Sequence, residues 1–221
     1  IIMFAPLGIF CLLASIFSEI GFFIIYDLAS YFFLLSFVLI FHALITYGSI
    51  LSFFRLNPII FFRKLKEVLL FAFSTSSSSA TMPLTLKTVK EKLGVDQSVA
   101  SFCIPLGATI NMDGTAIMQG IATVFIAQAY GVDLQITDYL MVILTATLAS
   151  IGTAGVPGVG LIMLAMVLQQ VGLPVEGIAL IIGVDRLLDM IRTAVNVSGD
   201  SMIACIISST QGSLNKSKFF D

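Results

Sequence analysis

Long uncharged runs alternate with short charged segments along the chain. Residues 1–18 carry no charge, and residues 28–54 carry none unless His42 is protonated. Each run meets or approaches the ~20 residues that a helix needs to cross a bilayer, so the pattern predicts two membrane-spanning helices. The second run leads into the basic segment "FRLNPIIFFRKLKE", which the positive-inside rule places in the cytoplasm.

Four consecutive serines, Ser76–Ser79, lie within a third uncharged run, Val68 to Leu86. Basic segments flank this run on both sides, and a helix that crossed the membrane would place one of them outside. A re-entrant hairpin keeps both inside, with the serines at its tip and Pro83 just beyond them. The alternative is a single Ser-rich spanning helix whose hydroxyls bond backbone carbonyls one turn back.

The rest of the chain repeats this plan in the opposite orientation. A span from about Ser101 to Gly131 is interrupted by "GATINMDGTA", and the uncharged run at residues 139–175 is broken by "SIGTAGVPGVG". That run is too long for one span, which predicts a hairpin entering from the outside. A last span, about Ile178 to Ser208, leads to a basic end. We therefore expect an all-α membrane protein whose transmembrane helices accompany two oppositely oriented re-entrant helical hairpins, an inverted repeat.

Five polar residues of the last span recur at spacings of three and four, which places them on one face of a helix. They are Asp185, Asp189, Arg192, Asn196 and Asp200. A charge near the bilayer centre costs about 2.5–3.5 kcal/mol on insertion scales, so we expect this stripe to face the protein interior. One interpretation is a salt-bridge ladder that pairs Asp189 with Arg192 and Asp185 with Arg186, and the other is a ligand site.

The ligand interpretation rests on complementary chemistry. Arg192 offers a planar, bidentate donor pair to a carboxylate, and Asp189, one turn away, accepts from an ammonium group, so the pair predicts an acidic amino acid. The serine tip and a half-helix N-terminus would supply donors for its second carboxylate. Hard oxygen ligands near the interrupted helix suit a small monovalent cation better than a transition metal. These are Asp113, Asn111, Asp200 and the free carbonyls around Gly107.

Composition agrees with a membrane environment. Hydrophobic residues make up 58% of the chain, charged residues 11%, and the mean hydropathy is +1.06, values of a polytopic membrane protein. The net charge of −2 argues against a nucleic-acid partner. The cysteines Cys11, Cys103 and Cys205 lie singly, without the spacing of a metal site or a disulfide framework. His42 is the only histidine, and we expect it to be a packing or lipid-interface residue without a role in the site.

In this order and spacing, "SSSSATMP", "GATINMDGT", "SIGTAGVPGVG" and "DMIRTAVNVSGD" closely resemble the dicarboxylate/amino acid:cation symporter family, the glutamate and aspartate transporters. The resemblance covers nearly the whole chain, from the fifth helix of that fold onward. The chain also begins in apolar sequence without an initiator Met, so we expect a fragment that lacks the family's first four helices. The resemblance implies two scaffold-type helices in residues 1–60 and a transport core in residues 61–221.

The resemblance also implies an activity and a setting. The activity is sodium-coupled symport of acidic amino acids, aspartate or glutamate, by alternating access, with Na+ as the coupling ion. The setting is a multi-pass protein of the plasma membrane, or of the cell inner membrane in a bacterium, in contact with lipid. The missing scaffold helices would assemble it into a homotrimer.

Residues at matching positions take on the roles that they have in the family. Substrate would contact Ser77, Ser78, Thr115, Val156, Gly160, Asp189, Arg192, Thr193 and Asn196. Sodium would bind at one site through Gly107, Asn111, Asn196 and Asp200, at a second through Thr109, Met112, Ser150, Ile151 and Thr153, and at a third through Asn111 with Asp113. Arg192 would hold the side-chain carboxylate of the substrate, with support from Asp185, and Asp189 would hold the amino group.

Two features depart from the family. A second arginine usually lies in the first hairpin tip or just after the aspartate of the last helix, and here those positions are Ser76 and Met190, with Arg186 as a candidate substitute. In the animal glutamate transporters, the residue four positions beyond the threonine of "NMDGT" is a glutamate that carries a proton and permits potassium counter-transport. Here it is Gln119, whose amide does not titrate, so we expect uptake driven by sodium alone.

Several alternatives stay open. An amine-free C4-dicarboxylate transporter, proton- or sodium-coupled, should lack Asp189, and a neutral amino acid transporter should lack Arg192, whereas this chain has both. A passive channel is a further alternative. An intramembrane protease is a distant one, because "YD" at Tyr26–Asp27 and "SGD" at 198–200 resemble its paired-aspartate motif poorly and Asp27 is expected in a loop. We expect no enzyme activity.

Overall fold

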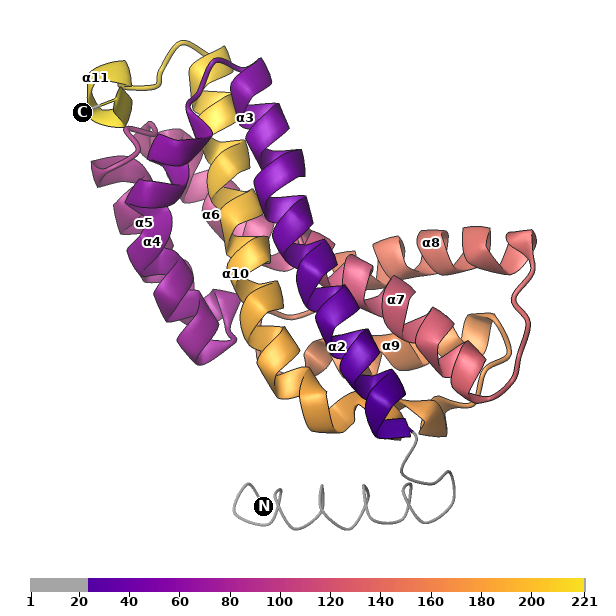
Figure 1. The fold of residues 1–221 in the computed structure, drawn as a ribbon. Helices are drawn as coiled ribbons and strands as arrows, with labels where there is room; N and C mark the ends of the chain where they lie inside the picture. The colour runs from indigo at the N-terminus through magenta and orange to yellow at the C-terminus, as the bar shows by residue number, and fades with distance from the viewer. Residues whose placement is uncertain (1–23, 221) are drawn as a thin grey trace.

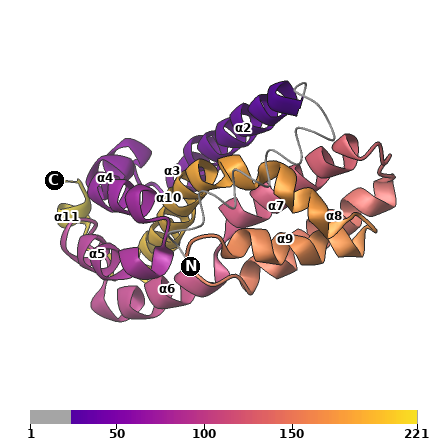
Figure 2. The same ribbon diagram turned by 90° about the horizontal axis from the view of Figure 1, so that it is seen from below.

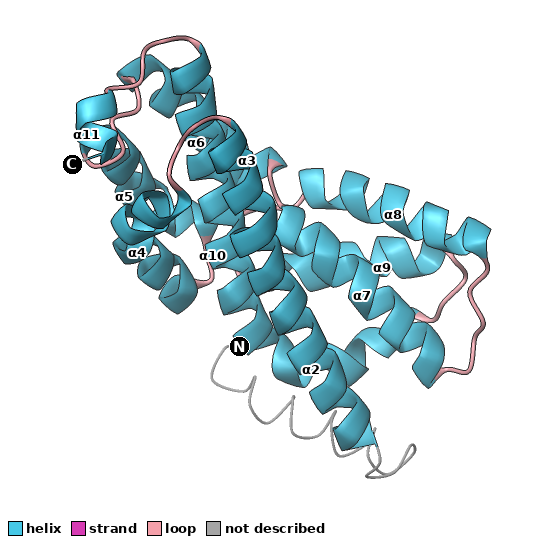
Figure 3. Ribbon diagram, turned by 45° about the horizontal axis from the view of Figure 1, so that its top comes forward, coloured by secondary structure: helices cyan, strands magenta, loops and turns pink. Residues whose placement is uncertain are grey.

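The computed structural model describes residues 24–220, and this part of the chain consists of helices joined by short loops, without a strand (Figure 3). The apolar runs lack the strict alternation of a half-buried strand, and helices satisfy their backbone hydrogen bonds internally. The predicted all-α class is therefore confirmed for the described residues. The first predicted span, residues 1–18, lies outside them.

One long apolar helix corresponds to the second predicted span. α2 (Ile24–Phe41) continues through a π-helical segment, η2 (His42–Tyr47), into α3 (Gly48–Phe53). Within residues 24–220, its part Tyr26–Phe53 is the one helix long and apolar enough to cross a bilayer, with a mean hydropathy of 2.3. Asp27 lies in the first turn of α2, so the expectation that it lies in a loop is wrong.

The serine run separates two helices that pack against each other, α4 (Pro58–Thr75) and α5 (Ser78–Glu91). Ser76 ends α4 in the left-handed conformation, with a φ of 51°. The hydroxyl of Ser77 caps α5 by accepting the N–H of Ala80 at 3.2 Å. The serines therefore form a turn between two helices, and the interpretation of a single Ser-rich helix is wrong.

The first helix of this pair begins earlier than predicted. Pro58 occupies the first helical position, where its missing N–H costs nothing, and the side chain of Asn57 accepts the N–H groups of the next two residues. The basic segment predicted as a connection is thus the start of α4, and the predicted division after residue 60 falls in its first turn. Pro83, expected just beyond the turn, lies inside α5.

The predicted interruption and the second helix pair are both present. α6 (Gln97–Ile110) and α7 (Asp113–Ala129) are separated at Asn111 and Met112, within "GATINMDGTA". α8 (Ile136–Ile151) and α9 (Val159–Gln170) pack together and are joined by residues 152–158, "GTAGVPG". Gly158 ends this loop with a φ of +81°, a conformation that glycine adopts without steric cost.

The longest helix of the described part, α10 (Ile178–Thr210), follows the short turn η3 (Val175–Gly177) and runs through the middle of the molecule (Figure 1). It contacts α2, α4, α5, α6, α7 and α9. The α4–α5 pair lies on one side of α10 and the α8–α9 pair on the other (Figure 2). All five residues of the polar stripe are buried, which confirms that this face points into the protein.

Near the C-terminus of the chain, Lys64 of α4 links α4 to the end of α5 and to the last helix. The side chain of Lys64 donates to the backbone carbonyls of Lys92 at 3.1 Å and Lys218 at 2.5 Å. Lys218 belongs to the short last helix, α11 (Lys216–Phe220), which packs against α4. In the neighbouring loop Asp96 caps α6, and the hydrogen bonds it accepts from Ser98 lower the pKa of its carboxyl below the usual value.

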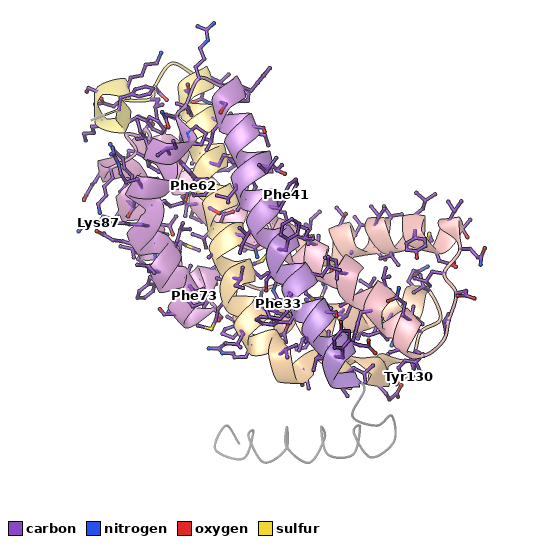
Figure 4. All side chains as sticks on the ribbon, in the orientation of Figure 1. Phe33, Phe41, Phe62, Phe73, Lys87 and Tyr130 are labelled. Atoms are coloured by element: carbon purple, nitrogen blue, oxygen red, sulfur yellow. The ribbon has the colours of Figure 1, made fainter. Side chains whose placement is uncertain are left out.

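Large apolar side chains cover much of the outer surface. Figure 4 places Phe33 and Phe41 along α2 and Phe73 near the end of α4, and these rings are 69%, 50% and 40% exposed. Contiguous apolar surface of this kind marks contact with lipid or with further helices. The surface therefore agrees with the membrane class that the composition indicates.

Candidate functional site

Arg192 forms the centre of a buried charged group on α10. Its side chain is 2% exposed, and it donates from Nη1 to Oδ1 of Asp185 at 3.2 Å and from Nη2 to Oδ1 of Asp189 at 2.7 Å. Both carboxylates are buried as well, so the group carries a net charge of about −1 when all three are ionised. The Asp189–Arg192 pair of the predicted ladder is present, but Asp185 pairs with Arg192 rather than with Arg186.

The tips of the two helix pairs meet beside this charged group. The hydroxyl of Ser77 donates to the carbonyl of Gly155 at 2.8 Å, and the N–H of Ser79 donates to the same carbonyl at 3.1 Å. A Cβ at Gly155 would lie 3.1 Å from Cβ of Ser78, so only glycine allows this approach without displacement. From the same loop the N–H of Gly158 donates to Oδ2 of Asp189 at 3.1 Å.

A cavity of about 20 Å³ lies between the two tips and α10. It is lined by Ser76, Ser78, Met112, Thr115, Thr153, Ala154, Gly155, Val156, Gly160, Asp189, Arg192, Thr193 and Asn196. Every residue predicted to contact substrate is in this set except Ser77, which bonds the opposite tip instead. The hydroxyl of Ser76, which was not among the predicted substrate contacts, is buried here without a hydrogen-bond partner among the described residues. A volume of this size holds about one water, so an amino acid fits only if a tip moves.

Two members of the first predicted sodium set, Gly107 and Asn111, lie against a third, Asp200. This carboxylate is 3% exposed, and its Oδ1 accepts a hydrogen bond from Nδ2 of Asn111 at 2.9 Å. A Cβ at Gly107 would lie 2.7 Å from Cγ of Asp200, so glycine brings the α6 backbone directly against the carboxylate. Carboxylate, amide and backbone oxygens are hard ligands, and the cluster therefore fits a small hard cation.

Asn196 connects the helix interruption to α10. Its Oδ1 accepts the N–H of Gly114 at 2.8 Å, and its Nδ2 lies 3.3 Å from both Sδ of Met112 and Oγ1 of Thr115. Gly114 is needed here because a Cβ would lie 2.9 Å from Oδ1 of Asn196. The start of α7 is thus held against Asn196, and the end of α6 against Asp200.

The second predicted sodium set is spread over α6, the interruption, the end of α8 and the α8–α9 loop. Met112 and Thr153 line the small cavity and Ser150 is buried nearby on α8, whereas Thr109 and Ile151 are exposed. The three hydroxyls of this set donate to carbonyls of their own helices at 2.8–2.9 Å. Any ligands from these residues would therefore include backbone carbonyls, and this set stays a prediction.

Two residues that the sequence analysis missed contact Asp113. Nε2 of His42 lies 2.9 Å from Oδ2 of Asp113, and the hydroxyl of Tyr47 donates to the same oxygen. His42 was expected to be a packing or lipid-interface residue, and the packing of α2 on α7 and α10 brings its π-helical segment to the interruption, beside a predicted sodium ligand. An ionisable residue inside an apolar span was the available signal, since such residues usually face the protein interior.

Comparisons with known proteins agree with this geometry. A family model described as the sodium:dicarboxylate symporter family matches residues 1–210. An excitatory amino acid transporter of Caenorhabditis elegans is 45% identical over 217 residues, which cover 94% of this chain and 42% of that protein. A proton/glutamate-aspartate symporter of Escherichia coli (strain K12) is 38% identical over 218 residues, 99% of this chain and 50% of that protein.

A third similar protein is excitatory amino acid transporter 1 of Rattus norvegicus, 49% identical over 153 residues, which cover 69% of this chain and 28% of that protein. The chain thus spans about half of the length of the relatives it matches, or less. The matched part includes the serine run, the interruption and the polar stripe of α10.

Proposed function

The chain belongs to the sodium:dicarboxylate symporter family, and we propose that it forms the substrate- and ion-binding part of a secondary active transporter. The transporter carries an acidic amino acid, aspartate or glutamate, together with sodium by alternating access. Relatives named as a proton/glutamate-aspartate symporter and as a proton/sodium-glutamate symport protein support this proposal. The plasma membrane, the trimer and the division into scaffold and core at residue 60 stay predictions of the resemblance.

One observation carries the proposal, and it is the buried group of Arg192 with two carboxylates between two helix tips. Burying three charges is unfavourable unless they have partners, and their mutual pairing leaves one carboxylate charge in excess. An amino group would complete the pairing of Asp189, which releases guanidinium N–H groups of Arg192 for the side-chain carboxylate of the substrate. A ligand with both groups satisfies the whole cluster.

The helix tips supply the rest of the substrate site. Ser76 and Ser78 line the cavity at the start of α5, where helix N–H groups lack intrahelical partners. Such donors favour an anion, and we assign them to the main-chain carboxylate. Val156 and Gly160 approach from the opposite tip. Entry then requires the tips to separate, so we propose that the α8–α9 loop is the outer gate.

Sodium is transported cargo in this proposal. Gly107, Asn111, Asn196 and Asp200 would hold one ion, and Asn111 with Asp113 another, on opposite sides of the interruption. Asn196 lines the substrate cavity, as does Met112, which lies between Asn111 and Asp113 in the sequence. Ion binding at these ligands would therefore order the helix interruption against α10. That order would favour substrate binding, which is the thermodynamic requirement for coupling.

Gln119 bears on the coupling ion. It is fully buried, its Nε2 lies 3.5 Å from the carbonyl of Gly160, and its Oε1 has no hydrogen-bond partner in the described part. A neutral amide beside the substrate cavity neither releases a proton nor offers a cation a negative charge. We therefore expect uptake that needs neither proton symport nor internal potassium.

Uptake into proteoliposomes tests function and coupling together. With the intact protein at clamped voltage, an inward sodium gradient should drive radiolabelled aspartate above its external concentration, and internal potassium or choline should give equal rates. Failure to accumulate aspartate or glutamate would reject the proposed function. Accumulation driven by a pH gradient without sodium would instead assign proton coupling, and a strict need for internal potassium would contradict the role given to Gln119.

The re-entrant orientation of the α4–α5 pair predicts a labelling pattern. Cysteines introduced by Lys66→Cys and Glu91→Cys, at exposed positions in the middle of α4 and at the end of α5, should both react with a membrane-impermeant thiol reagent only from the cytoplasm. Asp133→Cys, in the exposed α7–α8 loop, is the matched control and should react only from outside. Labelling of either Lys66→Cys or Glu91→Cys from outside would contradict the predicted orientation.

A further inference from the structure

Arg186 follows Asp185 directly on α10, but its side chain does not join the buried charged group of Asp185, Asp189 and Arg192. Its side chain is exposed, whereas Asp185 and Asp189 are buried, and it forms no ion pair within the described residues. It is not among the residues that line the small substrate cavity. The sequence suggested Arg186 as a candidate substitute for the family's second arginine. Its side chain does not supply that arginine inside the small cavity.

Arg186 instead lines a larger cavity of about 530 Å³ between α9 and the first half of α10. Pro157 and Gly158 border this outer cavity, while Gly155 and Val156 border the small one. The α8–α9 loop is thus the wall between the two spaces. Asp189 lines both, and the N–H of Gly158 bonds its carboxylate across that wall.

The net charge beside the α8–α9 loop determines whether an acidic amino acid is attracted or repelled. Asp185, Asp189 and Arg192 sum to about −1, a charge that repels an acidic amino acid, which itself carries about −1 at neutral pH. Arg186 adds one positive charge at the mouth and brings the local sum to about zero. The other walls of the outer cavity are apolar, which concentrates the field of the single guanidinium.

We propose that Arg186 determines specificity by capturing a carboxylate of the incoming amino acid in the outer cavity, before the α8–α9 loop moves. The guanidinium has a free bidentate donor face there, and Asp189 is the next charged group on the path inward. The inference rests on the proposed function, because it assigns the encounter step of the same substrate. Capture of this kind raises the rate of association and leaves the later transport steps unchanged.

The test compares Arg186→Gln with the wild-type protein in proteoliposomes, at fixed sodium, with ionic strength varied by choline chloride. We expect the KM for aspartate to rise about tenfold at low ionic strength with kcat unchanged, and the difference to shrink as salt screens the charge. Arg186→Lys keeps the charge and should give a smaller rise. Arg63→Gln, the same change at an exposed arginine on α4 without an ion pair, is the matched control and should leave KM unchanged.

Equal KM values and equal salt dependence for wild type and Arg186→Gln would overturn the role of Arg186 while leaving the proposed function intact. A lower kcat at unchanged KM would also overturn it, since Arg186 would then act after capture. Absence of aspartate uptake by the wild type would reject the proposed function itself. If Arg186→Gln does not fold, the rise in KM of Arg186→Lys must still disappear at high ionic strength, or the inference is wrong.

Discussion

Replacing Arg192 with cysteine is expected to abolish the uptake of aspartate and glutamate and to permit the uptake of small neutral amino acids. Arg192 is the one cation among the described residues that lines the small cavity, and it already bonds Asp185 at 3.2 Å and Asp189 at 2.7 Å. Without it, a substrate carboxylate would enter beside two buried carboxylates. Leaving a buried charge without its partner costs about 3–5 kcal/mol, which is at least about 100-fold in affinity.

Neutral amino acids are affected differently because their ammonium group keeps its acceptor. Asp189 has no competing guanidinium in Arg192→Cys, and the space left by the guanidinium accommodates a small apolar side chain. The measurement is the uptake of radiolabelled aspartate, alanine and serine under an inward sodium gradient. Undiminished aspartate uptake in Arg192→Cys would disprove the substrate assignment.

Two further variants separate a lost site from a lost fold. Arg192→Lys keeps the charge but not the bidentate geometry, so it should retain the fold and weaken aspartate uptake by at least about tenfold. Arg63→Cys removes an exposed arginine of α4 and should leave uptake unchanged. Thermal unfolding of each variant in detergent shows whether the protein is intact.

Gly107→Ala is expected to give the second-largest effect, a weakening of sodium binding. A Cβ at this position would lie 2.7 Å from Cγ of Asp200, so either the carboxylate or the α6 backbone must shift. Asp200 is buried and bonded to Asn111 at 2.9 Å, which leaves it little room to move. Displacing groups that orient a metal ligand typically weakens metal binding about 10- to 100-fold, and we expect the sodium concentration for half-maximal uptake to rise by that factor.

Gly120→Ala is the matched control for this prediction. Gly120 is also a helical glycine of the interrupted helix, in α7, but a Cβ there meets nothing within 4 Å. Alanine should therefore be tolerated and slightly stabilise the helix. If both variants keep the wild-type sodium dependence, the assignment of Gly107 and Asp200 to a sodium site is wrong.

Local sequence was sufficient for the helices and for the places where they break. The polar stripe of α10 was predicted because residues three and four apart share a helix face, and that face is buried. The break at Ser76–Ser77 was predicted because basic segments flank the serine run on both sides, and the break at Asn111–Met112 because glycine, asparagine and aspartate cluster within one apolar span. Helix bounds were less accurate, as the early start of α4 at Pro58 shows.

Contacts between distant residues were decided only by the tertiary structure. Ser77 bonds a carbonyl 78 residues away, and His42 reaches Asp113, 71 residues away, through the packing of α2 beside the interruption. The direction of Arg186 likewise depends on which neighbour covers each side of α10, so the sequence could name it only as a candidate substitute for the second arginine, whereas it lines the outer cavity. Periodicity determines which face of a helix is polar, because it is a property of one helix. Which residues meet across that face depends on how separate helices pack, and that arrangement is a property of the whole chain.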